Sequence, residues 1–363
     1  MKKIMFHVPS NIIAEKLTKI CRNNKINIKN IDKYILENNI VNMVDFSYES
    51  YFVIKEFMKN NWECYITGMD SIDIKKLNFK SIYDVKKGTV SQFNIEKLNK
   101  KIDIMFVKVV GDVFRRVEYI SEYLTNLNDN FNGIIINNPK AMLKGMDKRY
   151  LIDLIGRGMS VIDTTYFKKD ISFNDIDRKI KNKKDYIIKP INGELSTNLS
   201  QLDCISEEIL RNAESSVEGW IMQPYMKEIW NGEYQMFFIG DKYIRAQKKE
   251  YSFVNEDEKN KAPNQGSRKI IAYIPIKQEI KKALEYKREF EKLYDTELLI
   301  WRCDYIKDKN NEVKLLELET VNPGWFFRYI SIEEKKYFVK IIFDYIENMV
   351  DSNKTEYIGE MVI

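Results

Sequence analysis

The chain has 363 residues, 44% of them hydrophobic, which is enough to bury the cores of two or three packed subdomains. Its 59 Lys and Arg against 54 Asp and Glu give a net charge of only +5, and no long basic block is interleaved with aromatics, which argues against nucleic-acid binding. No apolar run approaches the ~18 residues of a membrane-spanning helix, and four scattered cysteines without Cys-x-x-Cys spacing favour a reducing cytoplasm over a zinc or disulfide framework.

The single histidine, His7, limits the chemistry that this chain can perform. A Ser-His-Asp triad or a multi-histidine metal site would have to be built around one residue near the N-terminus. We expect His7 to be a structural residue at the end of a strand. Catalysis would then rest on carboxylates, lysines, arginines and metals.

In the first third of the chain, short apolar strands alternate with amphipathic helices. The predicted strands span residues 3–8, 62–67, 102–110 and 133–138. The predicted helices span residues 12–23, 49–60 and 117–127. This alternation predicts a mainly parallel sheet covered on both faces. No glycine-rich fingerprint follows the first strand, so a nicotinamide cofactor is not implied.

From about residue 139 the pattern changes. A turn is expected at 137–143, helices at 147–158 and 174–182, and strands at 160–167 and 185–190. Beyond residue 215 the strands look antiparallel, and they are predicted at 219–225, 233–240, 242–249, 298–306 and 313–321. A long polar loop (252–269), a helix (277–293) and a final helix (333–350) complete the chain.

The hairpin formed by the last two strands carries the most constrained motif, "LLELETVNPGWFF" at 315–327. Glu317 and Glu319 alternate with Leu316 and Leu318, so both carboxylates point to one face. Pairing around the turn at 308–312 can place Asp304 beside Glu317. Converging carboxylates suit Mg²⁺ that bridges substrate phosphates, and Asn322 could add a neutral oxygen ligand or an orienting amide. The alternative is a solvated strand face whose acids pair with surface lysines.

Two lysines and one apolar strand could serve a nucleotide. Lys148 opens a helix, and Lys189 ends a strand before a polar turn, where each could contact a phosphate. The segment "WIMQPYM" (220–226) could line an adenine pocket, with Glu233 within reach of a ribose hydroxyl. The alternatives are ordinary surface lysines and a buried strand followed by a loop.

Taken in order along the chain, these motifs resemble the ATP-grasp enzymes. The resemblance covers about residues 100 to 330 and is greatest to the glutathione-synthetase-like branch, which includes ribosomal-protein glutamate ligases and the D-cycloserine-forming ligase. It implies α/β and α+β architecture, with a Rossmann-like α/β domain at 1–138, a central ATP-grasp subdomain at 139–214 and a C-terminal subdomain with the metal site at 215–363. ATP would lie between the two α+β subdomains.

The resemblance also implies nucleotide contacts. Lys148 and Lys189 would contact the nucleotide phosphates, and Glu233 would be the acid that contacts the nucleotide. The adenine hinge would consist of Gln223, Pro224, Tyr225 and Met226.

The same resemblance implies the metal site and the catalytic residues. Asp304, Glu317 and Glu319 would bind two Mg²⁺ ions. Many members have Asn in the third place, and the "ELE" form is similar to the cycloserine-type branch. Arg302 would stabilise the transferred phosphoryl group, and Lys248 would face phosphate or substrate. Weaker candidates for substrate or phosphate contacts are Arg245, Arg268 and Asn322.

The activity implied is ATP-dependent ligation in the cytoplasm. A carboxylate would be phosphorylated to an acyl phosphate, and an amine or related nucleophile would attack it, which releases ADP and phosphate. Substrates would be small molecules or peptides, and the protein would act as a homodimer or tetramer without nucleic acid or membrane. The loop 252–269 does not match glutathione synthetase, so glutathione synthesis is not expected. The alternatives are an ATP-grasp small-molecule kinase and a non-catalytic ATP-binding scaffold.

Overall fold

The computed structural model describes residues 1–23, 44–108, 116–192, 200–206, 208, 210, 218–252 and 268–360. The chain forms two compact units. Unit 1 comprises Met1–Gly111, Glu122–Pro139 and Asn322–Ile363, and unit 2 comprises Asp112–Ser121 and Lys140–Val321. In the described ranges no helix combines the length and the apolar character that a membrane crossing requires. Most of the polar loop at 252–269 and of the turn after Lys189 lies outside the described residues.

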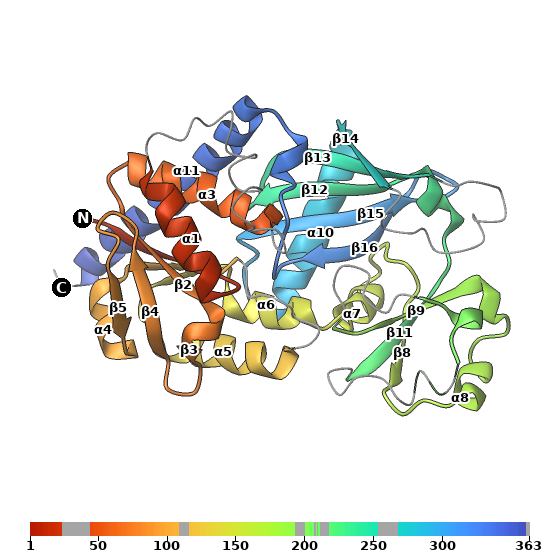
Figure 1. The fold of residues 1–363 in the computed structure, drawn as a ribbon. Coiled ribbons are helices and arrows are strands. Elements are labelled where there is room, and N and C mark those ends of the chain that lie inside the picture. The colour runs from red at the N-terminus through yellow and green to blue at the C-terminus, as the bar shows by residue number, and fades with distance from the viewer. Residues whose placement is uncertain are drawn as a thin grey trace. The chain divides into compact units, whose positions relative to one another are not determined.

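Unit 1 is built on a sheet of seven strands in the order β3-β4-β2-β1-β6-β7, with β5 paired to β4 (Figure 1). The strands are β1 (Lys3–Val8), β2 (Glu63–Gly68), β3 (Ile72–Asp73), β4 (Asn78–Asp84), β5 (Val90–Phe93), β6 (Ile104–Phe106) and β7 (Ile134–Ile136). β2, β1, β6 and β7 run parallel, as predicted. The antiparallel strands β3, β4 and β5 were not predicted.

The first helix shows why its sequence folds locally as it does. Helix α1 (Asn11–Arg22) begins after Ser10, whose side chain accepts a hydrogen bond from the backbone N–H of Ile13. Its buried residues follow helical spacing, so one face packs inward; they are Ala14, Leu17, Thr18, Ile20 and Cys21. The other helices of this part of the chain are α3 (Val44–Lys59), α4 (Ile95–Lys101), α5 (Val117–Asn130), α11 (Ile332–Glu360) and the short 3₁₀ helices Met69–Ser71 and Phe327–Tyr329.

His7 lies at the end of β1 in the interior of unit 1. Its side chain is buried, and the Tyr123 hydroxyl lies 3.1 Å from Nδ1. Burial lowers the pKa of His7 to about 3, so the imidazole is neutral at physiological pH. This environment agrees with the structural role expected from the sequence.

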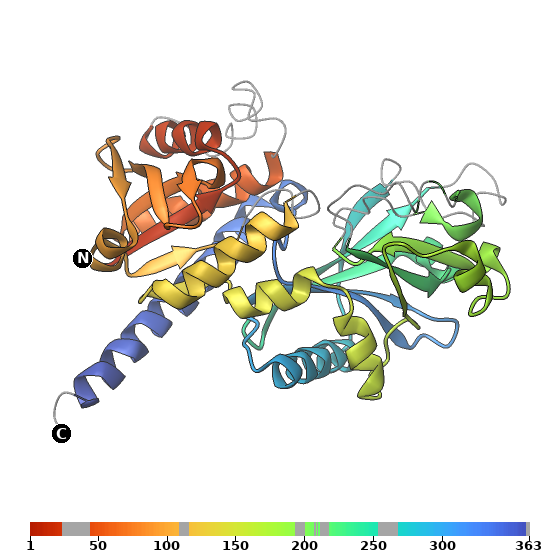
Figure 2. The same cartoon turned by 90° about the horizontal axis from the view of Figure 1, so that it is seen from below.

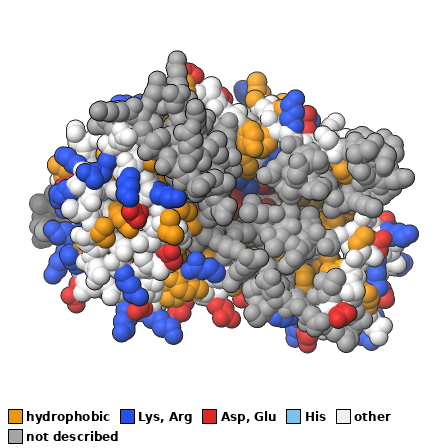
Figure 3. Space-filling view, viewed as in Figure 1, with side chains coloured by type: hydrophobic (Ala, Val, Ile, Leu, Met, Phe, Trp, Pro, Cys, Tyr) orange, Lys and Arg blue, Asp and Glu red, His pale blue; other side chains and the backbone are white. Residues whose placement is uncertain are grey.

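The surface of the described residues carries both signs of charge. On the face drawn in Figure 3, Lys and Arg side chains are scattered, with acidic and apolar side chains between them. Such mixing agrees with the small net charge of +5.

Unit 2 contains two antiparallel sheets. The four-stranded sheet has the order β10-β9-β11-β8, and the five-stranded sheet has the order β14-β13-β12-β15-β16. The strands are β8 (Thr165–Lys168), β9 (Tyr186–Pro190), β10 (Ser200–Gln201), β11 (Gly219–Pro224), β12 (Glu233–Ile239), β13 (Lys242–Tyr251), β14 (Arg268–Tyr273), β15 (Ile300–Lys307) and β16 (Val313–Glu319). The helices are α6 (Pro139–Met146), α7 (Tyr150–Gly156), α8 (Phe173–Asp177), α10 (Lys277–Tyr294) and the 3₁₀ helices Lys183–Asp185, Leu202–Cys204 and Lys227–Asn231.

Two local predictions in this region need correction. The segment 137–143, expected as a turn, contains the start of α6, because proline suits the first position of a helix, where its missing N–H is not needed. The strand expected at 160–167 is regular only from Thr165. Before it, Val161 forms a single parallel bridge with Leu315.

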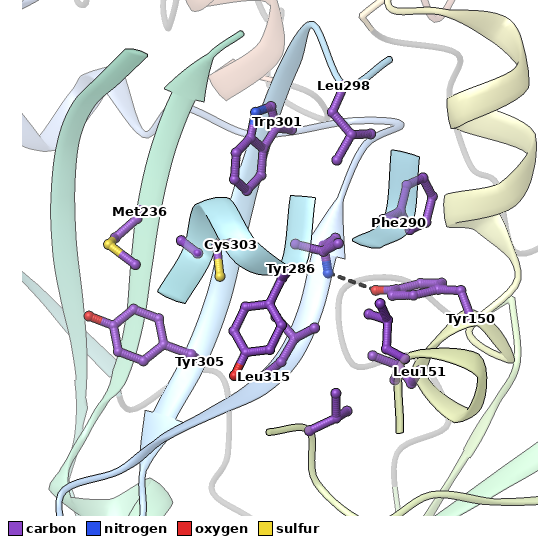
Figure 4. Packing of buried hydrophobic residues seen from close by; sticks show 14 of the residues in the cluster. Tyr150, Leu151, Met236, Tyr286, Phe290, Leu298, Trp301, Cys303, Tyr305 and Leu315 are labelled. Carbon is purple, nitrogen blue, oxygen red and sulfur yellow. Dashed lines mark hydrogen bonds between the residues drawn. The ribbon is translucent and has the colours of Figure 1, made fainter. Parts of the chain in front are cut away.

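One face of the five-stranded sheet belongs to the core of unit 2. Figures 1 and 2 show α10 alongside this sheet, and Figure 4 shows Tyr286 and Phe290 of α10 among residues of β15 and β16. The Tyr150 hydroxyl accepts a hydrogen bond of 2.7 Å from the backbone N–H of Leu318 (Figure 4). The β15–β16 pairing shifts register beside Tyr305. Leu315 and Leu318 therefore reach the core, whereas strict alternation along the strand would place Leu316 there together with Leu318.

Candidate functional site

The opposite face of the five-stranded sheet is charged where β15 meets β16. Arg302 and Asp304 alternate along β15 with core residues such as Cys303. Across the hairpin, Asp304 is the Cα partner of Glu317, and Arg302 is the partner of Glu319. Cross-strand partners share a face, so the structure brings together the three acids that the sequence grouped.

Each of the three acids has a donor. Arg302 contacts Asp304 twice, from Nε to Oδ1 at 2.6 Å and from Nη2 to Oδ2 at 2.7 Å, and both side chains are buried. Burial lowers the pKa of Arg302, but the Asp304 carboxylate outweighs this effect and raises it above its ordinary value. Lys148 Nζ lies 2.7 Å from Glu317 Oε1, and Glu319 Oε1 accepts a 3.2 Å hydrogen bond from the backbone N–H of Val321.

Lys148 approaches this face from the segment that precedes α7. Its backbone N–H donates to the carbonyl of Ile191, and its side chain is 6% exposed. A buried ammonium requires a partner, and Glu317 supplies one. The structure thus anchors Lys148 to the end of the four-stranded sheet through its backbone and to the acids through its side chain.

Lys189 lies on β9 of the four-stranded sheet, where it is the Cα partner of Ile221. Burial lowers its pKa to about 8; Glu317 opposes this shift, and Lys148 adds to it. Lys148 is in contact with Glu317, and the charges of Glu317 and Lys148 both influence the pKa of Lys189.

The predicted adenine hinge lies at the end of β11, the strand that pairs with β9 and its Lys189. Gln223 is buried and lies two positions from Ile221, so it shares the face on which Lys189 lies. Pro224 ends β11. The backbone N–H of Tyr225 donates to the carbonyl of Asp185 at 2.7 Å, which joins the hinge to the segment before β9.

The rest of the hinge is partly exposed. Met226 follows β11, and its carbonyl accepts from the N–H of Ile229. The Tyr225 hydroxyl accepts from Trp230 Nε1 at 2.7 Å, and burial raises the pKa of Tyr225. The hinge therefore enters a short, internally bonded 3₁₀ turn.

Glu233 belongs to a second group on the charged face. Its Oε1 is 2.6 Å from Lys249 Nζ, and its Oε2 accepts a 2.8 Å hydrogen bond from the Tyr251 hydroxyl. Lys249 is the Cα partner of Glu233 on β13. This lysine was not predicted from the sequence.

Lys248, which was predicted to face phosphate or substrate, lies on the other face of the sheet. Its Cα partner is Tyr234, which neighbours Tyr305 on the core side, and its ammonium pairs with Glu250 at 3.0 Å. The reason is the two-residue period of a strand. The structure brings Lys249, one residue further on, to the face that carries Asp304.

Two buried glutamines complete the charged face and were also not predicted. Gln235 of β12 donates to Asp304 Oδ2 at 2.9 Å, and Gln247 of β13 donates to Gln235 Oε1 at 2.7 Å. Part of the signal was present on β12, where Glu233 and Gln235 alternate with Tyr234 and Met236; on β13 the neighbouring Lys248 and Glu250 are also charged, so alternation does not single out one face there. On β12, such alternation indicates one polar face.

The three weaker candidates lie in different places. Arg245 is on the charged face and donates to Gln247 Oε1 at 3.2 Å. Arg268 begins β14, but its side chain lies outside the described residues. Asn322 is buried and belongs to unit 1.

The donor set determines which metal could fit. Among the described residues, no group of three His, Cys, Asp or Glu side chains is arranged to hold a metal ion. Asp304 and Glu317 nevertheless face each other as cross-strand partners. Mg²⁺ is usually bound by one or two carboxylates together with substrate phosphates, rather than by a full protein cage. The two opposed carboxylates fit that pattern.

Comparisons with known proteins support the fold. No family model and no curated protein matches the chain. A D-cycloserine synthetase structure has a TM-score of 0.62 at 14% identity, covering 96% of this chain and 99% of that one. A D-alanine–D-alanine ligase from Bacillus anthracis has a TM-score of 0.59 at 13% identity, covering 98% and 100%. The ATP-grasp ligase PsnB, complexed with a minimal precursor, has a TM-score of 0.54 at 12% identity, covering 95% and 99%. The prediction from sequence is confirmed: the chain has the ATP-grasp fold.

Proposed function

We propose that the chain is an ATP-dependent ligase that joins a carboxylate to an amine or related nucleophile through an acyl phosphate. The observation that carries this proposal is the charged face of the five-stranded sheet, where Asp304 opposes Glu317 and where Arg302 and Lys148 contact these two acids. The fold supports it, because the similar structures are described as ligases and synthetases.

The cations of the site suit phosphoryl transfer. That reaction depends on positioning and charge neutralisation more than on an acid–base residue, so a chain with one buried histidine can perform it. Lys148 and Lys189 would bind the nucleotide phosphates. Lys148 would exchange its contact with Glu317 for a phosphate oxygen, and Lys189, with a pKa lowered to about 8, would gain an anionic partner that stabilises its charged form.

The metal would lie at the acidic edge of this face. Asp304 and Glu317 would hold Mg²⁺ together with the substrate phosphates. Glu319 would become the third ligand only by a movement of its side chain, since the described acids do not form a group of three around a metal. When bound, the metal supplies positive charge to the phosphates of ATP. Arg302 would keep Asp304 ionised and oriented. Binding of two ions is part of the proposal.

The nucleotide base and ribose would be bound by other residues of unit 2. The hinge from Gln223 to Met226 would contact adenine, and Glu233 would contact the nucleotide. The hinge lies at the end of β11, which pairs with β9 and its Lys189, and Glu233 begins β12, which pairs with β15 and its Asp304. One nucleotide would therefore contact both sheets of unit 2.

The reaction would proceed in two balanced steps. A substrate carboxylate oxygen attacks the γ-phosphorus of ATP, the bond to the bridging oxygen breaks, and ADP leaves; Arg302 would stabilise the charge of the transferred phosphoryl group. The nucleophile then attacks the acyl carbon, phosphate departs with the electrons of the C–O bond, and the amine releases a proton to water. Arg245 would extend the cationic surface beside these groups.

The experiment that tests this function is incubation of the protein with ATP, Mg²⁺ and a panel of carboxylates and amines, followed by mass spectrometry of the products. We expect ADP, phosphate and a condensed product of a small molecule or peptide. Formation of AMP would contradict the acyl-phosphate route. A phosphorylated alcohol would indicate the kinase, and nucleotide binding without turnover would indicate a scaffold. The glutathione-synthetase-like branch, the cytoplasmic location and a homodimer or tetramer stay predictions.

A further inference from the structure

Two glutamine side chains lie side by side in the interior of the charged face. Gln235 and Gln247 are both 0% exposed and are Cα partners across β12 and β13. Gln235 is also the Cα partner of Asp304 on the other side. Burying a primary amide is unfavourable unless its donors and acceptor are bonded, so the bonds that these amides make decide why they are here.

One end of the pair is set by Arg245. Its Nη1 donates to Gln247 Oε1 at 3.2 Å. A guanidinium can only donate, so the oxygen of Gln247 must face it. The amide nitrogen of Gln247 is then directed the other way, and it donates to Gln235 Oε1 at 2.7 Å.

The other end is set by two carboxylates. Gln235 Nε2 donates to Asp304 Oδ2 at 2.9 Å and to Glu233 Oε1 at 3.0 Å. Ionised carboxylates only accept, so the nitrogen of Gln235 must face them. The direction of the whole row is therefore imposed from both ends, by a cation at Arg245 and by anions at Asp304 and Glu233.

This row has a consequence for the two acids. Asp304 and Glu233 share one amide nitrogen, which gives one hydrogen to each and separates two like charges. If the side-chain amide of Gln235 were flipped, its oxygen would face both carboxylates and repel them. The bond from Gln247 opposes that rotation.

We propose that Gln235 and Gln247 are positioning residues that orient Asp304 for the metal and Glu233 for the nucleotide. This inference rests on the proposed function. Neither glutamine would touch substrate; Gln235 acts through the carboxylates, and Gln247 acts through Gln235. Groups that orient metal ligands in this way typically change metal affinity by about 10- to 100-fold when they are removed.

The test uses Gln235→Met, Gln247→Met and the double variant, because methionine keeps the volume and removes the amide. The measurement is the Mg²⁺ concentration that gives half-maximal ADP binding, by calorimetry. We expect it to rise about tenfold in Gln235→Met and by a smaller factor in Gln247→Met. The double variant should match Gln235→Met, since Gln247 reaches Asp304 and Glu233 only through Gln235, and saturating Mg²⁺ should restore ADP affinity.

Two controls separate positioning from general damage. Gln278→Met changes an exposed glutamine of α10 and should leave the Mg²⁺ dependence unchanged. Gln247→Glu keeps the acceptor for Arg245 but loses the donor to Gln235, so it should behave no better than Gln247→Met. Thermal unfolding of each variant identifies a loss of folding, and Gln247→Met provides the test if Gln235→Met does not fold.

The outcomes distinguish the two claims. Wild-type protein that shows no Mg²⁺-dependent ADP binding overturns the proposed function and this inference with it. Wild-type binding together with an unchanged Mg²⁺ requirement in folded Gln235→Met overturns the inference alone. Additive losses in the double variant would also overturn it, because independent structural effects add whereas a row does not.

Discussion

The two faces of the five-stranded sheet differ although the same strands build both. Along β15, Trp301, Cys303 and Tyr305 point into the core, whereas Arg302 and Asp304 point to the charged face. On the core side the rings stack, with the centroids of Phe238 and Trp301 4.2 Å apart. On the charged side, most contacts are ion pairs or hydrogen bonds between two polar groups, which are cations, amides or carboxylates.

The difference teaches which residues stabilise the fold and which perform chemistry. Packed aromatic and aliphatic groups stabilise a domain when they are buried. Buried ion pairs are weak contributors, because desolvation offsets much of the attraction. A face that retains several of them, with amides bonded between them, is therefore better explained by a ligand that needs these charges.

The largest expected effect is on the charged face. Glu317→Gln keeps the shape but removes a proposed metal ligand, so ATP turnover of the folded variant should fall about 100- to 1,000-fold. The unfolding midpoint should also fall, because the buried Lys148 ammonium loses its anionic partner. The control is Glu312→Gln, at an exposed acid in the turn of the same hairpin. Turnover at the wild-type rate in Glu317→Gln would remove Glu317 from the site.

The corresponding change on the core face should affect stability instead. Trp301 is 1% exposed, and Trp301→Ala should lower the free energy of unfolding by about 3–5 kcal/mol. Urea denaturation measures this loss. ADP affinity of the protein that remains folded should be close to wild type. A loss below about 1 kcal/mol would show that this face is less tightly packed than the structure indicates.

Adjacent lysines on β13 provide the sharpest comparison of the two faces. Lys249→Met leaves Glu233 without its cation and should weaken ADP binding about tenfold, which corresponds to ~1.4 kcal/mol. Lys248→Met, on the other face, should leave binding nearly unchanged. Calorimetry measures ADP binding to both variants. A larger loss in Lys248→Met than in Lys249→Met would mean that Lys248, and not Lys249, lies on the charged face.

The smallest expected effect is a pH dependence from Lys189. Its pKa of about 8 lies below the ordinary 10.5, so Lys189 of the folded protein loses its proton at a lower pH than an ordinary lysine does. Its attraction for phosphate should fall as pH rises through 8, and ADP affinity should decline a few-fold between about pH 7 and 9. Lys189→Arg stays protonated and should flatten that decline. Equal pH dependence in both proteins would exclude Lys189 as its source.

The same shift has a consequence for stability, with the opposite sign. Because the pKa is lowered on folding, the unfolded chain binds more protons between about pH 8 and 10.5. The unfavourable contribution of Lys189 is complete below pH 8 and is relieved as pH rises through this range. The free energy of unfolding of Lys189→Met should therefore exceed that of the wild type by a larger amount at pH 7 than at pH 10.

The hairpin was the most predictable part of the site. A short turn rich in Asp and Asn sets the pairing of its strands, so the opposition of Asp304 and Glu317 could be inferred before the structure. The register shift beside Tyr305 could not, because a bulge depends on packing against the core. Because of that shift, Leu315 is buried in the core instead of Leu316.

Other parts depended on tertiary contacts that no local pattern reveals. Lys248 and Lys249 are chemically identical neighbours, and only the register of β12 against β13 assigns one of them to each face. Gln235 and Gln247 lie 12 residues apart on consecutive strands and contact each other only when these strands pair. In unit 1, the antiparallel strands β3 and β5 are short and are defined by their pairing with β4, which itself pairs with β2.

The most direct test of the central claim is a crystal structure of the protein with Mg²⁺ and a non-hydrolysable ATP analogue. The charged face predicts a metal ion bonded to Asp304 and Glu317, with the phosphates beside Lys148 and Lys189 and the base at the hinge from Gln223 to Met226. A nucleotide bound elsewhere, with the Arg302–Asp304 and Lys148–Glu317 pairs unchanged, would contradict it.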